Sequence, residues 1–478
     1  MRSVLWIIGG LAAILLALDL ATGGSEPVPA APARDVGFAS RPDLSPPVLT
    51  TATRRPGTTP GLVFVAPKRR SGQAGPTILD ERGDYVYFRP MPAGTVADDF
   101  RVQTYRGQPV LTWWEGKTND RGYGQGTWVI ADRSYREIAR IRAGGGLHGD
   151  LHELTLTAEG TALIPIYDPV KADLSPVGAA YSDGEAVDNV IQEVDVATGK
   201  VLWEWHSLDH VAITESYAGP PQKNRFPYDY FHINSIDVDT DGNLLVSARN
   251  TWALYKLDRR TGDVLWRLGG YRSDFALGDG VRFAWQHDAR RQPDGTITLF
   301  DNESTPKVGD RSRVLRLDVD EAARRVTVAK AFTHPAGLLA FAEGNAQGLA
   351  TGNTMVGWGM GRRVSELGPD GELLFDVKLP SDADTYRAYR FEWTGAPTGK
   401  PAVAVTPDGV AASWNGATDV TRWQVLAGPR PDALAPVADA PRDGFETVID
   451  AGLDGGYVAV RAFAGDRELA TSDPVRAE

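Results

Sequence analysis

A short motif recurs along this 478-residue chain: a polar turn with Gly, followed by a strand-like run of aliphatic and aromatic residues. In one form T-G precedes V-L-W, and in another D-G or E-G precedes a run such as N-L-L-V. The copies occupy residues 80–88, 157–164, 195–205, 239–249, 258–268, 292–301 and 368–377. Repeated hairpins of this kind predict an all-β fold.

The spacing of the repeat bears on the architecture. Copies of one form lie 53 residues apart (241 to 294) and copies of the other 63 apart (195 to 258). Dividing the repeat region by this spacing gives about six units, which predicts a six-bladed β-propeller over residues 61–393. An ordinary β-sandwich is the alternative, because D-G turns are common in all β proteins.

The last part of the chain, residues 394–478, has a different texture. It alternates short strand-like runs with Gly, Asp and Pro turns, at 410–414, 422–427, 446–450 and 457–463. A Trp on one central strand and a Tyr opening a later one resemble a fibronectin type III or immunoglobulin-like domain. We expect a small C-terminal β-sandwich without chemistry, because the region has no histidine.

The N-terminus carries an export or membrane signal. Residues 4–18 are apolar and uncharged, and Arg2 precedes them. Fifteen residues are short for a spanning helix of about 20, but Leu20 and Ala21 extend the run. Residues 1–22 are therefore interpreted as an uncleaved signal anchor or, alternatively, as the signal of a secreted protein. In both cases the body lies outside the cytoplasm. Residues 23–60, rich in Pro and Ala, are predicted to be an extended tether.

Composition excludes several classes of function. The formal charge is −12, from 50 Lys+Arg and 62 Asp+Glu, which argues against nucleic acid as a partner. Without cysteine there is no disulfide, thiolate catalysis or iron-sulfur cluster. We predict no metal and no cofactor.

The seven histidines all lie between positions 148 and 334. The strongest site candidates lie in three short segments that combine histidine with other polar residues: H-G-D-L-H-E, F-H-I-N-S and W-Q-H-D-A-R. A strand over 231–238 would place His232 and Asn234 on one face, and Arg249 ends the strand that follows. Together these three side chains suit an anionic substrate, because Arg presents a fixed fork of donors.

The other strings add further candidates. On a strand His287 and Asp288 would face opposite sides, so another partner should orient the His287 ring. His152 is favoured over His148 because it leads into a strand. Candidate substrate-binding residues are Arg290, His148 and His334. His206 and His210 are interpreted as surface loop residues.

Several longer segments resemble the arylsulfotransferase family, in its branch of exported propellers. They are D-L-H-E-L-T-L-T (150–157), D-Y-F-H-I-N-S through L-L-V-S-A-R (229–249), Y-K-L-D-R-R-T-G-D-V-L-W-R-L-G-G (255–270), W-Q-H-D-A-R (285–290) and G-N-T-M-V-G-W-G (352–359). The resemblance implies a six-bladed propeller that moves a sulfuryl group from an aryl sulfate to a phenol, without a nucleotide, through a sulfated histidine.

The same resemblance implies roles for individual residues. His287 matches the histidine that becomes sulfated, and His232 with Asn234 matches a His-x-Asn pair. Arg249 matches an arginine near the transferred group, and His152, with His148 as the alternative, matches a further active-site histidine. His152 or His232 would serve as general acid and base.

Two rival hypotheses stay open at this point. A non-catalytic extracellular propeller could bind protein or glycan ligands, and dispersed histidines would favour it. A quinone-dependent dehydrogenase also fits T-G-x-V-L-W repeats, but no vicinal cysteine pair accompanies them here.

Overall fold

The computed structural model describes residues 35–178, 184–220 and 226–477. The predicted anchor at 1–22 and the first part of the predicted tether lie outside these residues. Among the described residues, no helix has the length and apolarity needed to cross a membrane. Helical structure there is limited to four short segments: η1 (Ser175–Val177), α2 (Ser207–His210), η3 (Ile213–Glu215) and η5 (Gly359–Gly361).

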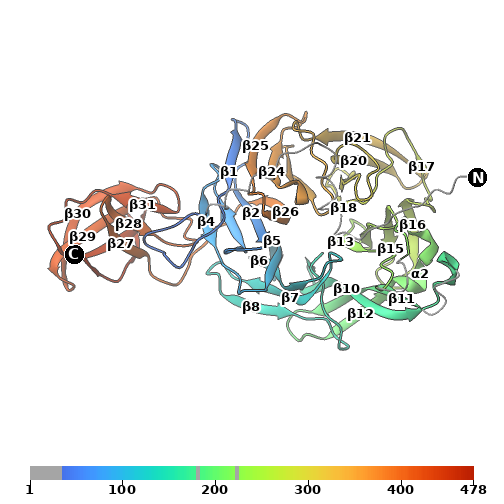
Figure 1. The fold of residues 1–478 in the computed structure, drawn as a ribbon, viewed down its shortest axis with the longest axis horizontal. Helices are drawn as coiled ribbons and strands as arrows, with labels where there is room; N and C mark the ends of the chain where they lie inside the picture. Colours follow the sequence, from blue (N-terminus) through green and yellow to red (C-terminus); the bar gives the residue numbers. More distant parts are fainter. Residues whose placement is uncertain (1–34, 179–183, 221–225, 478) are drawn as a thin grey trace, which may run out of the picture. The chain divides into compact units, whose positions relative to one another are not determined.

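The all-β prediction is confirmed: strands account for nearly all of the regular structure (Figure 1). Six sheets of four or five strands occupy residues 50–391, and we label them A to F in the order in which most of their strands follow along the chain. Sheet A, in spatial order, comprises β26 (Ala383–Phe391), β2 (Leu62–Arg69), β3 (Thr77–Leu79) and β4 (Tyr85–Phe88). Sheet B comprises β5 (Val96–Tyr105), β6 (Gln108–Thr118), β7 (Gly124–Ala131) and β8 (Glu137–Ile141).

The next two sheets are also four-stranded antiparallel meanders. Sheet C comprises β9 (Thr155–Leu156), β10 (Thr161–Ala172), β11 (Gly184–Asp195) and β12 (Val201–His206). Sheet D comprises β13 (Ile233–Val238), β14 (Leu244–Ala248), β15 (Ala253–Leu257) and β16 (Val264–Gly269).

Sheets E and F each carry a fifth strand at one edge. Sheet E comprises β18 (His287–Arg291), β19 (Ile297–Asp301), β20 (Arg313–Asp320), β21 (Arg325–Thr333) and β17 (Ala276–Leu277). Sheet F comprises β22 (Asn345–Gly348), β23 (Thr354–Gly357), β24 (Arg363–Leu367), β25 (Leu373–Lys378) and β1 (Thr50–Arg54).

The two forms of the sequence motif mark two different hairpins of these sheets. The D-G or E-G form precedes the second strand, as at β10, β14 and β19, whereas the T-G-x-V-L-W form precedes the fourth, as at β12 and β16. In the second form, Asp195 and Asp258 cap the turn by accepting the backbone N–H of the Thr three residues later, and Gly199 and Gly262 take positive φ. One motif therefore recurs at two positions within a repeat.

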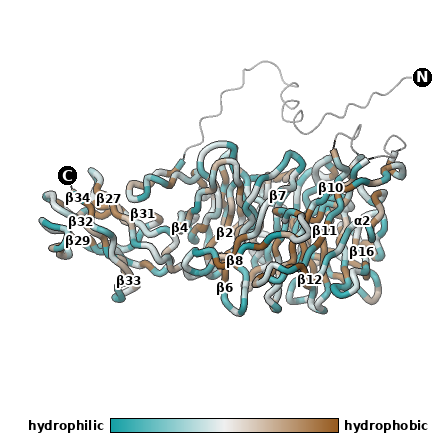
Figure 2. The backbone as a smooth tube through the Cα atoms, turned by 90° about the horizontal axis from the view of Figure 1, so that it is seen from below, coloured by the Kyte–Doolittle hydropathy of each residue, from teal (hydrophilic) through white to brown (hydrophobic). Residues whose placement is uncertain are grey.

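The hydrophobic core is divided among interfaces between successive sheets, which share clusters in the order A–B, B–C, C–D, D–E and E–F. A further cluster joins sheet F to sheet A, through residues such as Phe375 and Val63. Each sheet is thus buried on both faces. Figure 2 shows the hydrophobic stretches running along the strands.

Sheet A joins distant parts of the chain, because β26 pairs antiparallel with β2 more than 300 residues earlier. The predicted tether, 23–60, requires a correction for its second part. Phe38 and Leu44 are buried in the cluster between sheets F and A, and β1 pairs with β25. This segment therefore packs on the body, because its apolar side chains are buried and β1 pairs with the edge strand β25.

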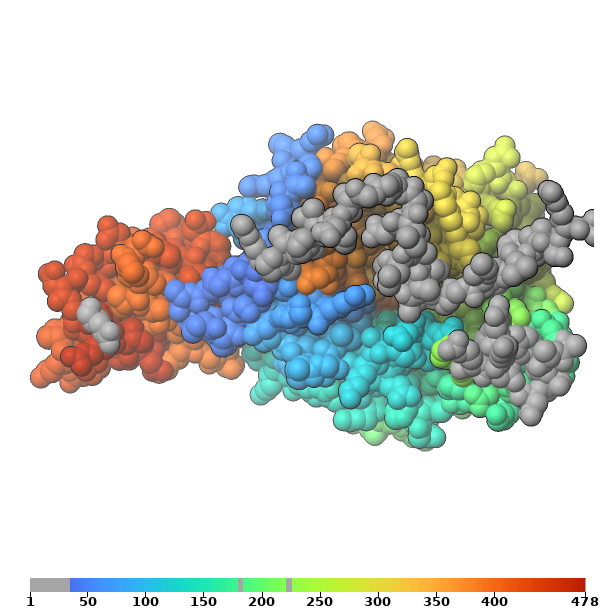
Figure 3. Space-filling view, viewed as in Figure 1, coloured from blue at the N-terminus to red at the C-terminus, as the bar shows by residue number. Residues whose placement is uncertain are grey.

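The C-terminal region forms two further sheets. One comprises β27 (Ala402–Thr406), β28 (Gly409–Ser413) and β31 (Glu446–Ile449); the other comprises β30 (Ala433–Pro441), β29 (Arg422–Arg430), β32 (Gly456–Ala464) and β33 (Arg467–Thr471), with β34 (Val475–Ala477) on β32. They share one core cluster that includes Trp423. In the space-filling view the C-terminal residues, orange to red, lie beside the blue first strands (Figure 3). Asn415 hydrogen-bonds both backbone groups of Phe88 there.

Candidate active site

Three of the predicted histidines come together where strands of sheets C, D and E begin. The ring centroids of His152 and His232 lie 4.9 Å apart. Tyr386, on β26, contacts both His152 and His287 edge-on, with centroids 5.4 and 6.4 Å away. Each histidine is at most 6 % exposed, so the three rings form one buried cluster around Tyr386.

Local backbone geometry, rather than strand alternation, aims two of these rings. The strand predicted from residue 231 begins at Ile233, and His232 precedes it with φ of 64°. A register shift follows between Ile233 and Ser235. His287 opens β18 between Trp285 and Asp288, both of which have φ of 58°. Left-handed residues at such a density indicate conformations held by the surrounding structure.

Every hydrogen bond that the three rings make within the described residues uses Nδ1. Asp150 holds Nδ1 of His152, and Asp229 holds Nδ1 of His232 at 2.5 Å. The Nδ1 atom of His287 lies 2.7 Å from the side-chain oxygen of Asn302. Because one nitrogen of each ring is occupied in this way, Nε2 is the nitrogen left for chemistry.

Sequence reasoning did not find these three partners. Asp150 and Asp229 lie two and three residues before their histidines, so the motifs contained a local signal for them. Asn302 had none, because it meets His287 only through the pairing of β18 with β19. The expectation that a residue other than Asp288 orients His287 agrees with this bond.

Arg249 lies beside the cluster and follows β14 directly. Its backbone N–H donates to the carbonyl of His232, and its guanidinium lies over the ring of Trp285, with Cζ 4.7 Å from the centroid. Its side-chain hydrogen bonds go to neutral oxygens of Asn250 and Thr305. None of the described carboxylates forms a salt bridge with it, and burial lowers the pKa of Arg249 to about 10.

The charge on Arg249 acts on the histidines. Burial first, and then this guanidinium, lower the pKa of His287 well below its ordinary range. Burial also lowers the pKa of His232, although Asp229 opposes the shift. Near neutral pH the His287 imidazole is therefore neutral, beside a cation that forms no salt bridge with the described carboxylates, although Asp229 acts on it electrostatically.

Asn234 joins sheet D to the backbone just before His287. Its side-chain nitrogen donates to the carbonyl of Gln286 at 2.6 Å, and its side-chain oxygen is buried without a hydrogen-bond partner. One N–H of this amide is thus engaged with the backbone of the residue that precedes His287.

The three residues predicted to bind substrate lie outside the histidine cluster. Arg290 is bound to Glu153 and to Asp288, at 2.8 Å from the latter, so its guanidinium belongs to the scaffold. His334 is buried with Asp376 at 3.3 Å and packs against Trp358, in sheet F. His148 is exposed and directly precedes Gly149. The described contacts of these residues do not include the three clustered rings.

A buried ionic network underlies the cluster. Arg101, Arg290 and Arg387 all bind Glu153, the residue after His152, and together they hold the pKa of that carboxyl below its ordinary value although burial opposes this. These residues come from β5, β18, β26 and the segment before β9. The network therefore ties sheets A, B, C and E together beneath the histidines.

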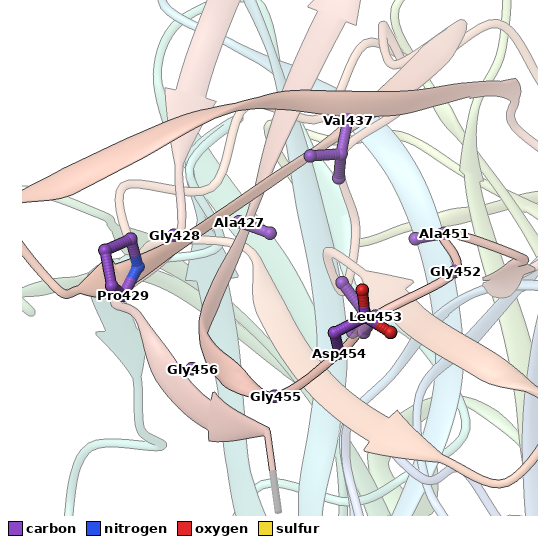
Figure 4. Close-up of a pocket in the computed structure, with 10 residues that line it drawn as sticks. All are labelled: Ala427, Gly428, Pro429, Val437, Ala451, Gly452, Leu453, Asp454, Gly455 and Gly456. Atoms are coloured by element: carbon purple, nitrogen blue, oxygen red, sulfur yellow. The ribbon is translucent and has the colours of Figure 1, made fainter.

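Other parts of the molecule offer little competing chemistry. A cavity of about 430 Å³ lies in the C-terminal sheets, lined by Gly-rich backbone with Val437 and Leu453 (Figure 4). A second, of about 250 Å³, lies between residues 67–74 and 91–97. Within the described residues, no group of three or more His, Cys, Asp or Glu side chains is arranged to hold a metal ion.

Comparison with known families assigns the chain. The family model described as arylsulfotransferase (ASST) matches residues 101–379, more than half of the sequence. The chain belongs to the arylsulfotransferase family. The matched region contains all three clustered histidines, Arg249 and Asn302. For this arylsulfotransferase family member, the family supports aryl sulfotransfer as the general reaction class, with aryl sulfates and phenols as the implied substrates.

Comparisons with other proteins add little to this assignment. Among curated proteins no match was found. A protein of unknown function from Bacteroides caccae is 12% identical, with a TM-score of 0.43 over 69% of this chain and 98% of that one. Virginiamycin B lyase from Staphylococcus aureus is 9% identical, with a TM-score of 0.31 over 77% and 96%. Similarities of this size carry no argument about activity.

Proposed function

We propose that this arylsulfotransferase transfers a sulfuryl group from an aryl sulfate to a phenolic acceptor, without a nucleotide, through a sulfohistidine at His287. The observation that carries the proposal is the pairing of a neutral, Nδ1-anchored imidazole with a half-buried arginine that forms no salt bridge with a described carboxylate. A partly desolvated cation that forms no salt bridge is costly in a purely structural protein. A bound sulfuryl group would supply the missing negative charge.

In the first half-reaction, the Nε2 lone pair of His287 attacks sulfur in line, and the bond from sulfur to the aryl oxygen breaks. Arg249 binds the sulfuryl oxygens, where its fork of donors matches their geometry. His152 or His232, each held by a carboxylate, gives a proton to the leaving aryl oxygen.

In the second half-reaction, a phenol replaces the departed aryl oxide. The same carboxylate-bound histidine takes the phenol proton, the phenol oxygen attacks sulfur, and the bond between nitrogen and sulfur breaks. The electron pair of the broken nitrogen–sulfur bond returns to Nε2 of His287. The two steps give ping-pong kinetics.

We also propose that sheets A to F are the blades of a six-bladed propeller, that the C-terminal sheets form a β-sandwich, and that the body acts outside the cytoplasm. The cyclic sharing of core clusters supports the first of these proposals. The shared cluster around Trp423 supports the second, and the apolar segment at 4–18 behind Arg2 supports the third.

The test is turnover of a chromogenic aryl sulfate by the purified full-length protein, with and without added phenol. We expect phenolate release that depends on the acceptor. His287→Ala should lower kcat/KM by at least about 10³-fold while the protein stays folded, since the nucleophile itself is removed.

His206→Ala is the matched control, because this histidine lies in sheet C, is 37% exposed in its side chain and pairs with Asp188 and Glu204 outside the cluster. It should retain wild-type turnover. Unchanged turnover by His287→Ala would remove His287 from the mechanism. A wild-type protein inert toward every aryl sulfate tried would remove the transferase proposal and favour a binding protein.

A further inference from the structure

Asn302 follows β19 and is held in one orientation by its surroundings. Its side-chain nitrogen donates to two backbone carbonyls, those of Ala340 at 3.2 Å and Glu343 at 2.8 Å. Two carbonyls on one side of an amide can face only its NH₂ group, so the side-chain oxygen must face His287. Ser312 further fixes this residue by donating to its backbone carbonyl at 2.8 Å.

This orientation determines the tautomer of His287. The oxygen of Asn302 can only accept, and so can the carbonyl of Trp285, which lies 3.1 Å from the same Nδ1. The hydrogen of the neutral ring is therefore on Nδ1, and the lone pair is on Nε2.

The partner of His287 differs in kind from the partners of its two neighbours. Asp150 and Asp229 occupy the corresponding nitrogen of His152 and His232, and a carboxylate stabilises a protonated imidazole. An amide carries no charge and takes no proton. Of three similar rings, the one assigned as nucleophile is the one with a neutral partner.

We infer that Asn302 is the positioning residue of the sulfuryl transfer, a neutral acceptor that keeps the hydrogen on Nδ1 of His287 through both half-reactions. The inference rests on the proposed function. When Nε2 forms its bond to sulfur, the ring becomes cationic and its Nδ1–H still donates to Asn302. When the phenol oxygen later attacks sulfur, the electron pair of the nitrogen–sulfur bond returns to Nε2, and a neutral imidazole leaves.

A carboxylate at this position would alter the second step. Aspartate would draw the Nδ1 hydrogen away from the sulfated ring, so the group leaving sulfur would have the character of an imidazolate. Imidazolate is the more basic species and therefore the poorer leaving group. The sulfated enzyme should then persist.

The experiment compares wild type, Asn302→Asp and Asn302→Ser by rapid mixing with a chromogenic aryl sulfate and a phenol. For Asn302→Asp we expect a burst of about one phenolate per active site and then slow turnover. The mass of the intact protein should rise by one sulfuryl group during the slow phase. Asn302→Ser, which cannot hold the ring as firmly, should lose at least about tenfold in kcat with little change in KM.

A pH profile separates this role from a merely structural one. The groups that act on or face the His287 ring, besides Asn302, are Arg249, His152, His232 and the ring of Tyr386. Against that background, a carboxylate at position 302 should move the acidic limb of kcat/KM to higher pH, because it favours the protonated ring. Asn243→Asp, in a surface turn of sheet D, is the control that should leave the limb in place.

The outcomes are distinct. A wild-type protein without turnover would overturn the proposed function. Wild-type turnover, together with an Asn302→Asp variant that shows neither a burst nor a shifted limb, would overturn the role of Asn302 alone. If Asn302→Asp does not fold, Asn302→Ser decides, and wild-type kcat in that variant would overturn the inference.

Discussion

At the scale of single residues, what distinguishes the three clustered histidines is the chemical nature of the group at Nδ1. Their burial is similar, and all three keep Nε2 free of described hydrogen bonds. Asp150 and Asp229 place a carboxylate at Nδ1 of their histidines, whereas Asn302 places a neutral amide oxygen at Nδ1 of His287. Division of labour within one cluster thus follows from two carboxylates and one amide.

Arg249 offers a direct test of anion binding. Replacing it with Lys keeps the positive charge but removes the planar fork and the contact with the face of Trp285. We expect kcat/KM for an aryl sulfate to fall about 10²-fold, with a higher KM for the donor. Steady-state kinetics against donor concentration measure this change. Wild-type kinetics in Arg249→Lys would mean that the guanidinium does not bind the sulfuryl group.

The lowered pKa of His287 makes a prediction about stability. The unfolded chain binds a proton near the ordinary histidine pKa of about 6.5, whereas the folded ring resists protonation. The free energy of unfolding should therefore fall as the pH drops below about 6.5, by up to about 1.4 kcal/mol per pH unit for this group.

Urea denaturation of wild type and His287→Gln at pH 7.5 and pH 5.5 checks the sign. The variant should lose less stability between the two pH values, because glutamine does not titrate. Comparing the two proteins cancels the opposite contribution of carboxyls whose pKa is raised by burial, such as Asp98. An equal loss in both would show that His287 does not resist protonation in the folded state.

At the scale of elements, the three histidines lie where strands of different sheets begin, and the Glu153 carboxylate links strands of sheets A, B and E through salt bridges. This carboxylate binds arginines from β5, β18 and β26. Replacing it with Gln leaves three buried guanidinium groups with one anion fewer, which should cost about 3 to 5 kcal/mol of unfolding free energy.

Chemical denaturation of Glu153→Gln measures that cost. Glu159→Gln, at a turn where the side chain is 65% exposed, should stay within about 0.5 kcal/mol of wild type. If the two variants proved equally stable, the network would be dispensable for folding.

The sequence predicted the positions of the turns correctly but missed the exact start of one strand. The turn motifs located hairpins correctly because Asp, Thr and Gly act within a few residues. The strand start at Ile233 and the bulge beside it were missed, because left-handed His232 is imposed by tertiary contacts and has no local sequence signal.

At the scale of the whole molecule, sheet A joins early and late strands. The C-terminal sheets contact the early part of the chain through hydrogen bonds and an aromatic pair. Phe38 and Phe445 have ring centroids 4.2 Å apart, and Tyr135 donates to the carbonyl of Gly416 at 2.6 Å. None of the described residues after 393 contacts the histidine cluster.

Removing residues 394–478 should therefore preserve aryl sulfate turnover while lowering the midpoint of thermal unfolding, since apolar groups such as Phe38, which packs on Phe445, become exposed. Turnover and thermal unfolding of the truncated protein against the full chain measure both effects. A truncated protein that is folded but inactive would assign the C-terminal sheets a part in catalysis.

The sequence by itself determined the all-β class, the family and the set His152, His232, His287 and Arg249 as candidates, because turn chemistry and motif residues act locally. The tertiary structure decided how those candidates differ. Asn302 reaches His287 only through strand pairing, and Tyr386 reaches the cluster only through β26 in sheet A. Tertiary packing also places Glu153 beside Arg290, so the Arg290 guanidinium is part of the scaffold. Contacts between residues far apart in the chain have no local pattern, so only the folded molecule reveals them.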